Sequence, residues 1–267
     1  MLYLIATPIG NLGDFSIRAV EVLKKVDWVF CEDTRRSSIL LHHYGIDKKL
    51  SPHHKFNEKQ SLESILQLLE GGKEIALLSD AGTPCINDPG FLLVEQCVER
   101  KIPFTAIPGP CSLINALVLS GFPLHRFQSI GFLPKKGALE ALRSIARFPG
   151  TTIILESPER IVATLELFST IDPQRNVAVV REMTKTFEEC VRGTAEEVAR
   201  ELKSRSVLGE ICLVIAPGNA PTESLSVEEL IAMLQDTFGV TLKEAIPMAA
   251  KLLQKPKREI YRNAHNR

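Results

Sequence analysis

Short apolar runs alternate with segments of helical periodicity along most of this 267-residue chain, and this alternation constrains the fold most strongly. It predicts β-α-β units, in which helices cover a largely parallel sheet. In the first part of the chain the apolar runs predict strands at 2–6, 27–31, 74–78 and 103–107. The segments with helical spacing predict helices at 16–26, 37–44, 62–69 and 91–100.

A second block with the same character follows. Its predicted strands are at 126–131, 152–155, 176–181 and 210–215, and its predicted helices are at 112–119, 138–147, 160–168 and 195–203. After Pro217 only helical periodicity remains, at 227–237, 241–253 and 257–265. We therefore predict an α/β fold of two α/β domains, 1–110 and 111–220, with a cleft between them, and a helical basic tail over 221–267.

The composition excludes several classes of protein. No apolar run reaches the ~20 residues that span a bilayer, and the first residues lack the basic start of a signal peptide. The six cysteines are scattered without a C-x-x-C pair, which argues against a zinc site or a disulfide scaffold and fits a reducing compartment. We expect a cytoplasmic protein with no membrane partner.

The charge is unevenly distributed, although the net charge is zero. Residues 243–267 contain seven Lys or Arg and two Glu, a net charge of +5, which leaves −5 on the rest of the chain. A basic tail on an acidic body predicts an anionic partner. A solvated helix face would show the same charges, and on charge alone both interpretations stay open.

The loop at 79–90, SDAGTPCINDPG, is the most informative stretch. Ligands of parallel sheets bind outside the carboxyl ends of the strands, and this loop follows a predicted buried strand. Two prolines stiffen it, which reduces the entropy lost on binding. Asp80 brings a carboxylate to the strand end. A connecting loop is the alternative, but it would not need so many constrained residues.

Five other loops follow predicted strands and are expected on the same rims, at 7–13, 32–36, 108–112, 156–160 and 181–188. The first contains neither G-x-G-x-x-G nor G-K-[ST], so a dinucleotide site and a P-loop are unsupported. In the second, Asp33 or Thr34 could cap the next helix instead of contacting a substrate. The loop at 108–112 could equally be a hinge between domains. The histidine pairs 42–43 and 53–54 lack the spacing of a metal site.

Taken together, these loops resemble the tetrapyrrole-methylase superfamily of S-adenosylmethionine-dependent enzymes, in its branch that methylates ribosomal RNA. The resemblance runs from residue 2 to about residue 218, and SDAGTPCINDPG is its most specific part. The shorter matching segments are TPIGNL (7–12), EDTR (32–35), NE (57–58), PGPC (108–111), GFLP (131–134), ESPER (156–160), REMTKTFE (181–188) and GE (209–210).

The resemblance implies a methyl donor, S-adenosyl-L-methionine, in the interdomain cleft of a homodimer. It implies methylation of the ribose 2′-hydroxyl of a cytidine in the decoding region of 16S rRNA, within the 30S subunit, with no metal and no DNA partner. The residues that it places around the donor are Pro8, Asp80, Gly82, Thr83, Pro110, Cys111, Ser112 and Leu155.

Methyl transfer to a hydroxyl requires an in-line approach, and a general base or a group that stabilises the developing oxyanion helps it. The catalytic candidates are Lys185, Glu156 and Glu182, with Glu188, Asp33 and Arg35 also open. We predict that Lys185 supports deprotonation of the hydroxyl. The residues expected to bind the substrate are Asp33, Arg35, Arg160 and Arg181.

A neutral chain has to gather its positive charge locally to bind RNA. The basic tail could supply it, together with Arg35, Arg36, Lys135, Lys136, Arg160, Arg181 and Arg192. Two other functions stay open. A methylase of a small tetrapyrrole is the first, and a non-catalytic ribosome-binding protein is the second. The EDTR segment and the basic tail count against the first, and the constrained loops count against the second.

Overall fold

The structure, a computed structural model of the chain, describes residues 1–218, 227–253 and 255–265. Contacts between residues divide the chain into two units, Met1–Pro217 and Gly218–Arg267, which are described separately. The predicted boundary between residues 220 and 221 lies outside the described residues, as does Arg267 of the basic tail. The predicted boundary between residues 110 and 111 stays a prediction.

The first sheet of the larger unit is wholly parallel, as the sequence predicts. Its strands, in spatial order, are β3 (Leu50–Pro52), β2 (Trp28–Cys31), β4 (Ile75–Leu78), β1 (Leu2–Ile5) and β5 (Phe104–Ile107). Strand β3 was not predicted. It is a three-residue edge strand that ends in proline, and proline is tolerated at a sheet edge but is a poor strand signal.

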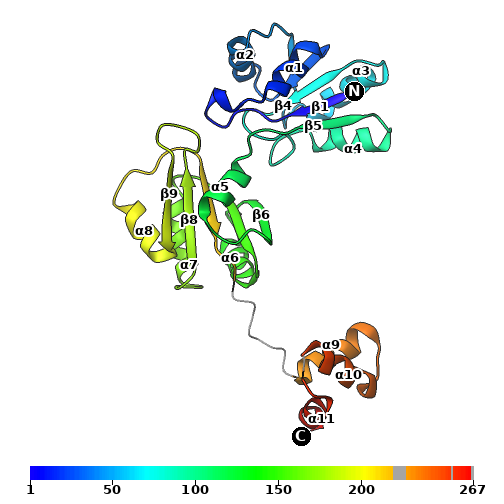
Figure 1. Cartoon of the computed structure of the whole chain (residues 1–267), viewed down its shortest axis with the longest axis vertical. Helices are drawn as coiled ribbons and strands as arrows, with labels where there is room; N and C mark the ends of the chain where they lie inside the picture. Colours follow the sequence, from blue (N-terminus) through cyan, green and yellow to red (C-terminus); the bar gives the residue numbers. More distant parts are fainter. Residues whose placement is uncertain (219–226, 254, 266–267) are drawn as a thin grey trace. The chain divides into compact units, whose positions relative to one another are not determined.

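Two pairs of helices cover the two faces of this sheet (Figure 1). They are α1 (Ile17–Lys25) with α2 (Thr34–His43), and α3 (Glu58–Glu70) with α4 (Phe91–Glu99). Successive strand residues point to opposite faces. Ala76 and Leu78 of β4 therefore pack against the first pair, and Ile75 and Leu77 pack against the second.

Helices α2 and α3 begin earlier than their apolar periodicity predicts. Helix α2 begins at Thr34 because the Asp33 carboxylate accepts a hydrogen bond from the Arg35 amide (2.9 Å) and caps the first turn. Helix α3 begins at Glu58, whereas its apolar periodicity starts only at Leu62. Apolar spacing therefore does not reveal a first helical turn made of polar residues.

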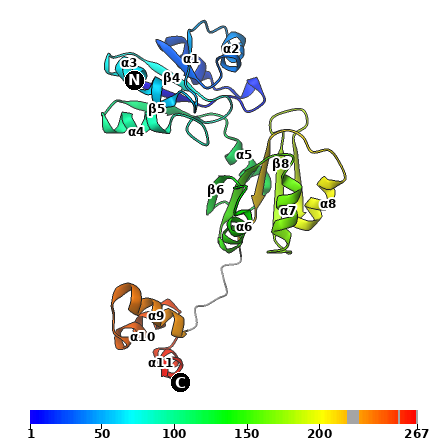
Figure 2. The same ribbon diagram turned by 180° about the vertical axis from the view of Figure 1, so that it is seen from behind.

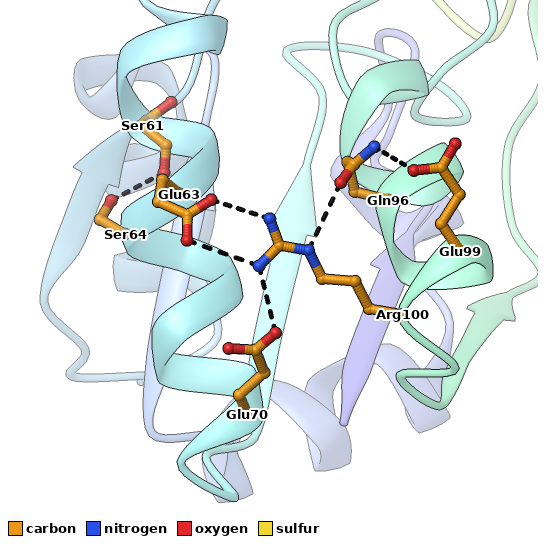
Figure 3. Close-up of polar contacts among 7 residues, drawn as sticks. All are labelled: Ser61, Glu63, Ser64, Glu70, Gln96, Glu99 and Arg100. Carbon is orange, nitrogen blue, oxygen red and sulfur yellow. Dashed lines mark hydrogen bonds and ion pairs between the residues drawn. The ribbon is translucent and has the colours of Figure 1, made fainter.

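Arg100, directly after α4, joins that helix to α3 (Figure 3). Its guanidinium donates to the Glu63 carboxylate (2.9 Å) and to the Glu70 carboxylate (3.1 Å) of α3. Its Nε also donates to Gln96 of α4 (3.4 Å). Single surface ion pairs contribute little, but this network holds one cation between two helices. The middle and the end of α3 are thereby tied to α4.

The second sheet is mixed, because only its β6–β7 pair is parallel. Its strands, in spatial order, are β6 (Phe127–Phe132), β7 (Thr151–Glu156), β10 (Ile211–Ile215), β8 (Asn176–Arg181) and β9 (Glu189–Thr194). Strand β9 was not predicted. It lies at the edge of the sheet, and only Val191 of its six residues is buried, so it lacks an apolar run.

Helix α5 (Ser112–Ser120) covers one face of the second sheet. The other face carries α6 (Ala138–Arg147), α7 (Ile161–Ser169) and α8 (Ala195–Lys203). Figure 2 shows α7 in front of the strands on this second face. Two helix-covered sheets confirm the predicted α/β fold class.

The smaller unit contains α9 (Val227–Phe238), α10 (Leu242–Leu252) and α11 (Lys257–His265), close to the predicted helices. Its own apolar core includes Leu230, Leu234, Ile246 and Ile260. The basic side chains of this unit are exposed at Lys243, Lys251, Lys255, Lys257, Arg258 and Arg262. No helix in the described part of the chain has the length and apolarity needed to cross a bilayer.

Candidate functional site

A cavity of about 350 Å³ lies within the Met1–Pro217 unit, among the loops that follow strands of both sheets. The 79–90 loop of the first sheet forms one wall, and the start of α5, the end of β7 and the start of β10 form others. Its lining residues are Ile9, Ala81, Gly82, Thr83, Ile86, Asn87, Asp88, Cys111, Ser112, Leu113, Phe132, Leu155, Glu156, Pro158, Met183, Gly209, Glu210, Ile211 and Cys212. Mostly apolar walls with a few polar groups are typical of a small-molecule site.

Backbone contacts hold the 79–90 loop in place. Gly82 exchanges two hydrogen bonds with Thr7, at 2.9 and 3.0 Å, and its positive φ of 82° is a conformation that glycine adopts without strain. The Ser79 hydroxyl donates to the Gly82 carbonyl (2.8 Å), and the Thr7 hydroxyl donates to the Ser79 carbonyl (3.0 Å). The first sheet thus presents a rigid wall to the cavity.

Five of the eight residues predicted to surround a donor line this cavity, namely Gly82, Thr83, Cys111, Ser112 and Leu155. Pro110 lies behind the wall, where its carbonyl accepts a hydrogen bond from the Thr83 hydroxyl (3.2 Å). Pro8 and Asp80 instead line a neighbouring cavity of about 210 Å³ beside α2. The structure therefore brings most, but not all, of the predicted set to one space.

Asp80 and Asp33 join the loops after β4 and β2. Asp80 Oδ1 accepts a hydrogen bond from the Asp33 amide (2.8 Å), and its Oδ2 lies 3.7 Å from Arg36. Hydrogen bonds from Arg35 lower the pKa of Asp33 to about 2. Asp33 therefore acts as the cap of α2, the alternative left open by the sequence. A substrate role for Asp33 and for Arg35, whose side chain is 89% exposed, stays a prediction.

Asp88 is a cavity residue that sequence reasoning did not single out. Burial raises its pKa to about 6, and the nearby charges of Glu32 and Asp80 add to the effect. Burial and the charge of Asp80 also raise the pKa of Glu32. Asp88 stood in the quoted SDAGTPCINDPG string, but the desolvation that perturbs it depends on packing that a sequence does not reveal.

The loop between β8 and β9 contributes a lysine between two carboxylates. Lys185 Nζ donates to Glu182 Oε1 (2.9 Å) and to Glu210 Oε2 (3.5 Å). Partial burial alone would lower the pKa of Lys185, but the hydrogen bond to Glu182 and the two carboxylate charges outweigh it and raise the pKa. The hydrogen bond from Lys185 lowers the pKa of Glu182. Both side chains are therefore charged at neutral pH.

Two glycines leave room for this arrangement. A Cβ at Gly209 would lie 2.0 Å from Glu182 Oε1, and a Cβ at Gly10 would lie 2.6 Å from Lys185 Cγ. Glu182 and Thr184 also have positive φ angles, 50° and 66°, which cost energy in non-glycine residues. The 181–188 loop is thus interlocked with the 7–13 loop of the first sheet and with Gly209.

Glu210 is the second cavity residue that sequence reasoning missed as a site residue. It lines the cavity, its side chain is 72% exposed, and its amide donates to Glu182 Oε1 (3.2 Å). The GE segment was visible at 209–210. Its proximity to Lys185 results from the antiparallel pairing of β8 with β10, which the sequence did not reveal.

The other predicted charged residues are engaged by protein partners. Glu156 is buried and accepts hydrogen bonds from the Ser157 amide (2.9 Å) and the Thr164 hydroxyl (2.8 Å), and it lies 3.4 Å from Arg160. Arg181 donates to Glu189 at 2.6 Å. These contacts leave the predicted catalytic role of Glu156 and the predicted substrate roles of Arg160 and Arg181 untested.

Metal ligands and reactive thiols have recognisable patterns of side chains. The described residues contain no group of three or more His, Cys, Asp or Glu placed to hold a metal. Cys111 and Cys212 line the cavity, but burial raises the pKa of Cys212 to about 12, so this thiol stays protonated and unreactive.

The chain is similar to known proteins over most of its length. The sequence model of the family described as Tetrapyrrole (Corrin/Porphyrin) Methylases matches residues 1–199. A ribosomal RNA small subunit methyltransferase I of Halalkalibacterium halodurans is 40% identical, over 99% of this chain and 94% of that protein. Proteins of the same name from Hydrogenobaculum sp. (47% identity, 82% of this chain, 96% of the relative) and Escherichia coli O157:H7 (40%, 98% and 94%) are also similar.

Solved structures share the fold at lower identity. A cobalt precorrin-4 methyltransferase of cobalamin biosynthesis superposes with a TM-score of 0.62 at 15% identity, over 80% of this chain and 94% of that one. A uroporphyrin-III C-methyltransferase of Thermus thermophilus, solved with S-adenosyl homocysteine, has a TM-score of 0.57 at 21% identity, over 80% and 96%. These likenesses support the two-sheet architecture.

Proposed function

Because the chain belongs to the tetrapyrrole (corrin/porphyrin) methylase family, we propose that it is an S-adenosylmethionine-dependent methyltransferase that acts on the RNA of the small ribosomal subunit. The main support is the cavity lined by the 79–90 loop and by Glu210, whose carboxylate pairs with Lys185. Lys185 and its other partner, Glu182, are not among the lining residues and reach the cavity wall only through Glu210. The wall formed by the 79–90 loop can hold a small donor, and the Glu210 carboxylate lies at another wall of the same cavity. Relatives of 40% identity along the whole chain, named for small-subunit rRNA, support RNA as the acceptor.

The cavity fits S-adenosylmethionine in size and in chemistry. Its volume of about 350 Å³ is within the range of small-molecule sites. Apolar side chains of Ile9, Leu113 and Leu155 can cover the adenine, and Thr83 and Ser112 line the same space. When bound, the donor supplies an electrophilic methyl group on a positively charged sulfur. Gly82, Cys111 and the other lining residues would hold and orient it.

Pro8, Asp80 and Pro110 support this wall from behind. Asp80 fixes the Asp33 amide, and Pro110 receives the Thr83 hydroxyl. We assign them to positioning of the donor loop, which refines their predicted role as direct contacts. A preorganised loop loses little entropy when the donor binds.

Lys185 is the catalytic candidate that the geometry supports best. Its raised pKa keeps it an ammonium at neutral pH, so it acts on the acceptor by stabilising the oxygen that loses its proton. Glu210 Oε2, at the cavity wall and 3.5 Å from Lys185 Nζ, is placed to take that proton. Glu182 is a positioning residue, because its Oε1 already accepts from Lys185 and from the Glu210 amide.

Glu156 is assigned a positioning role in place of the predicted catalytic one. It is 3% exposed, and both of its carboxylate oxygens accept hydrogen bonds from the protein. A general base needs an oxygen that can reach the acceptor. Glu156 instead orients Ser157 and Arg160 at the end of β7.

The acceptor is a ribose 2′-hydroxyl of a cytidine in 16S rRNA, presented by the 30S subunit. Large RNAs are held through phosphate contacts and shape, which demand positive surface. Exposed Lys257, Arg258 and Lys251 of the smaller unit supply such surface, as does Arg35 beside the site. A ribosomal substrate also favours a cytoplasmic location.

The functional protein is a homodimer. Exposed apolar side chains on α5 (Ile114, Val118) and on the edge strand β6 (Phe127, Phe132) support an association surface on the second sheet. Large apolar side chains exposed on one region are typical of protein–protein contacts. Light scattering should give twice the chain's own mass of 29.6 kDa.

The experiment that tests the function is transfer of a tritiated methyl group from S-adenosylmethionine to three acceptors: 30S subunits, naked 16S rRNA and a tetrapyrrole precursor. We expect labelling of 30S subunits, with the label on a cytidine ribose after nuclease digestion and mass spectrometry. Labelling of a tetrapyrrole precursor alone would instead make the chain a small-molecule methylase. Binding to 30S subunits without transfer to any acceptor would make it a non-catalytic ribosome-binding protein.

A further inference from the structure

Phe56 has the most exposed large apolar side chain of the described residues, at 95%. It lies in the 53–57 loop between β3 and α3. Single exposed apolar residues are common and carry no meaning alone. Three further properties of this loop, namely its hydrogen bonds, its position and its charge, make Phe56 different.

Hydrogen bonds hold the backbone on both sides of Phe56. The Asn57 side chain accepts from the His54 amide (2.7 Å) and donates to the Pro52 carbonyl (3.0 Å). The fully buried ring of His53 lies 2.8 Å from the Ser61 hydroxyl. The His54 ring meets the Phe56 ring edge-on at 6.1 Å. An aromatic side chain on a backbone held in this way loses little entropy when a flat partner covers it.

The loop is linked to the donor cavity. Glu58, two residues after Phe56, accepts a hydrogen bond from the Gly90 amide (2.8 Å). Gly90 ends the 79–90 loop, whose residues Ile86, Asn87 and Asp88 line the cavity. The Arg100 network also ties the middle and the end of α3, at Glu63 and Glu70, to α4 (Figure 3). The 53–57 loop is therefore connected, through Glu58, to a segment that lines the cavity.

The charge near Phe56 favours a polyanion. Lys55 and Lys59 flank it, both are exposed, and neither has a carboxylate within ion-pair distance in the described parts of the chain. Arg36, in the first turn of α2, is 66% exposed but lies 3.7 Å from the Asp80 carboxylate. An exposed aromatic ring flanked by two lysines without carboxylate partners is the combination with which proteins bind single-stranded nucleic acid: bases stack on the ring and phosphates contact the cations.

From these contacts we propose that the 53–57 loop binds an unpaired nucleobase of the RNA acceptor, with Phe56 as the stacking platform and Lys55 and Lys59 on the neighbouring phosphates. The proposal rests on the proposed function and deepens it. It assigns recognition of the substrate strand to a loop for which the sequence predicted no role. A base stacked here would hold the strand open beside the donor, so that the ribose of a nearby nucleotide can approach the methyl group.

The test compares Phe56→Ala, Phe56→Leu and Phe56→Tyr with the unchanged protein in methyl transfer to 30S subunits. Loss of one base stack by alanine substitution is worth ~1–3 kcal/mol, so Phe56→Ala should raise KM for the subunit about 5-fold to about 150-fold. Turnover at saturation and the Kd of S-adenosylmethionine should change by less than about twofold, since the ring touches neither the reacting atoms nor the donor. Ile17→Ala removes another exposed apolar side chain (80%), on α1, and should have no effect.

The conservative variants separate a nucleobase from a protein partner. Tyrosine keeps a π-face and should restore binding, whereas leucine keeps apolar area without one and should behave like alanine. If leucine restores binding, Phe56 docks on a ribosomal protein and the proposal is wrong. If alanine binds as well as phenylalanine, no stacking partner exists.

A second measurement tests the stacking site separately from the proposed methyl transfer. Fluorescence anisotropy of a labelled single-stranded RNA decamer measures base stacking without methyl transfer. If the unchanged protein labels no ribosomal substrate, the proposed function fails. In that event, weaker binding of the decamer by Phe56→Ala than by the unchanged protein still supports the stacking site, and equal binding overturns it.

Discussion

The 79–90 loop and the 181–188 loop both follow strands and both reach the cavity, but they are held by different kinds of contact. Backbone hydrogen bonds with Thr7 and a glycine at positive φ fix the first. Ion pairs of Lys185 with Glu182 and Glu210 fix the second, with two non-glycine residues at positive φ. The first sheet is parallel and regular, and the second is mixed, with antiparallel β10 between β7 and β8.

This difference is the basis of the division of labour that we propose, with the donor at the first loop and the acceptor at the second. A wall of backbone and small side chains suits a donor that is the same molecule in every reaction, because the wall is already ordered before the donor binds. A loop of charged side chains suits the acceptor, where a proton has to be held and moved. Backbone strain tends to accumulate at such sites, and Glu182 and Thr184 fit that tendency.

Of the changes to the two loops, removal of the Lys185 side chain should lower turnover the most. Loss of one group that stabilises an oxyanion typically lowers kcat about 100-fold to about 1,000-fold, so we expect Lys185→Ala to lower turnover by this amount. Lys185→Arg keeps the charge and should recover part of it. Single-turnover transfer of labelled methyl to 30S subunits measures the effect. Full turnover of Lys185→Ala with intact donor binding would remove Lys185 from the mechanism.

Gly209→Ala should have the next largest effect. The new Cβ would overlap Glu182 Oε1 and force that carboxylate away from Lys185. Misplacement by about 1 Å can cost roughly 100-fold in rate, so a loss between about tenfold and about 100-fold is expected.

Gly45→Ala is the matched control for the backbone. Gly45 also has a positive φ, 61°, but a Cβ there meets nothing within 4 Å. Both variants should lose about 1 kcal/mol of stability from the left-handed conformation, and only Gly209→Ala should lose turnover. Equal turnover in the two variants would show that the position of Glu182 does not matter.

The predicted elements and the missed ones differ in a consistent way. Strand β4 and the 79–90 loop were predicted because an apolar run followed by Gly and Pro is a local signal. Strand β9 and the approach of Glu210 to Lys185 were missed because they depend on pairing between β8, β9 and β10. Part of the cavity wall, such as Gly82 and Cys111, could thus be found from sequence, whereas the ion pairs of Lys185 and the desolvation of Asp88 required the fold.

The basic surface of the smaller unit should contribute moderately to binding of 30S subunits, and this contribution should weaken as the salt concentration rises. If Lys257 and Arg258 contact phosphates, Lys257→Glu/Arg258→Glu should weaken binding to 30S subunits. The slope of log K against log salt should become shallower by about 0.9 per lost contact. Titrations at several salt concentrations measure this slope. The control is Arg200→Glu/Lys203→Glu on α8, which reverses two other exposed cations and should leave the slope unchanged. The same slope in both double variants would exclude the smaller unit from RNA binding.

Asp88 should give the smallest effect, and only as a function of pH. Its folded pKa of about 6 is above the ordinary value of 3.8, so ionisation opposes folding. Stability should therefore fall as the pH rises between about 4 and about 6, because the folded state binds more protons than the unfolded state. Asp88→Asn should remove this fall and have the higher thermal midpoint at pH 7.5, with little difference at pH 4. The exposed Asp14→Asn is the control; the same pH profile for Asp88→Asn and the unchanged protein would contradict the assignment.

The division of labour is tested most directly by the Kd of S-adenosylmethionine, measured calorimetrically for Ala81→Leu and Lys185→Ala side by side. Ala81 lines the cavity proposed for the donor, on the 79–90 loop, and a larger side chain there would fill part of it. We predict a Kd raised at least about tenfold in Ala81→Leu, equivalent to ~1.4 kcal/mol, and changed less than about twofold in Lys185→Ala. Weak donor binding in Lys185→Ala together with unchanged binding in folded Ala81→Leu would contradict it.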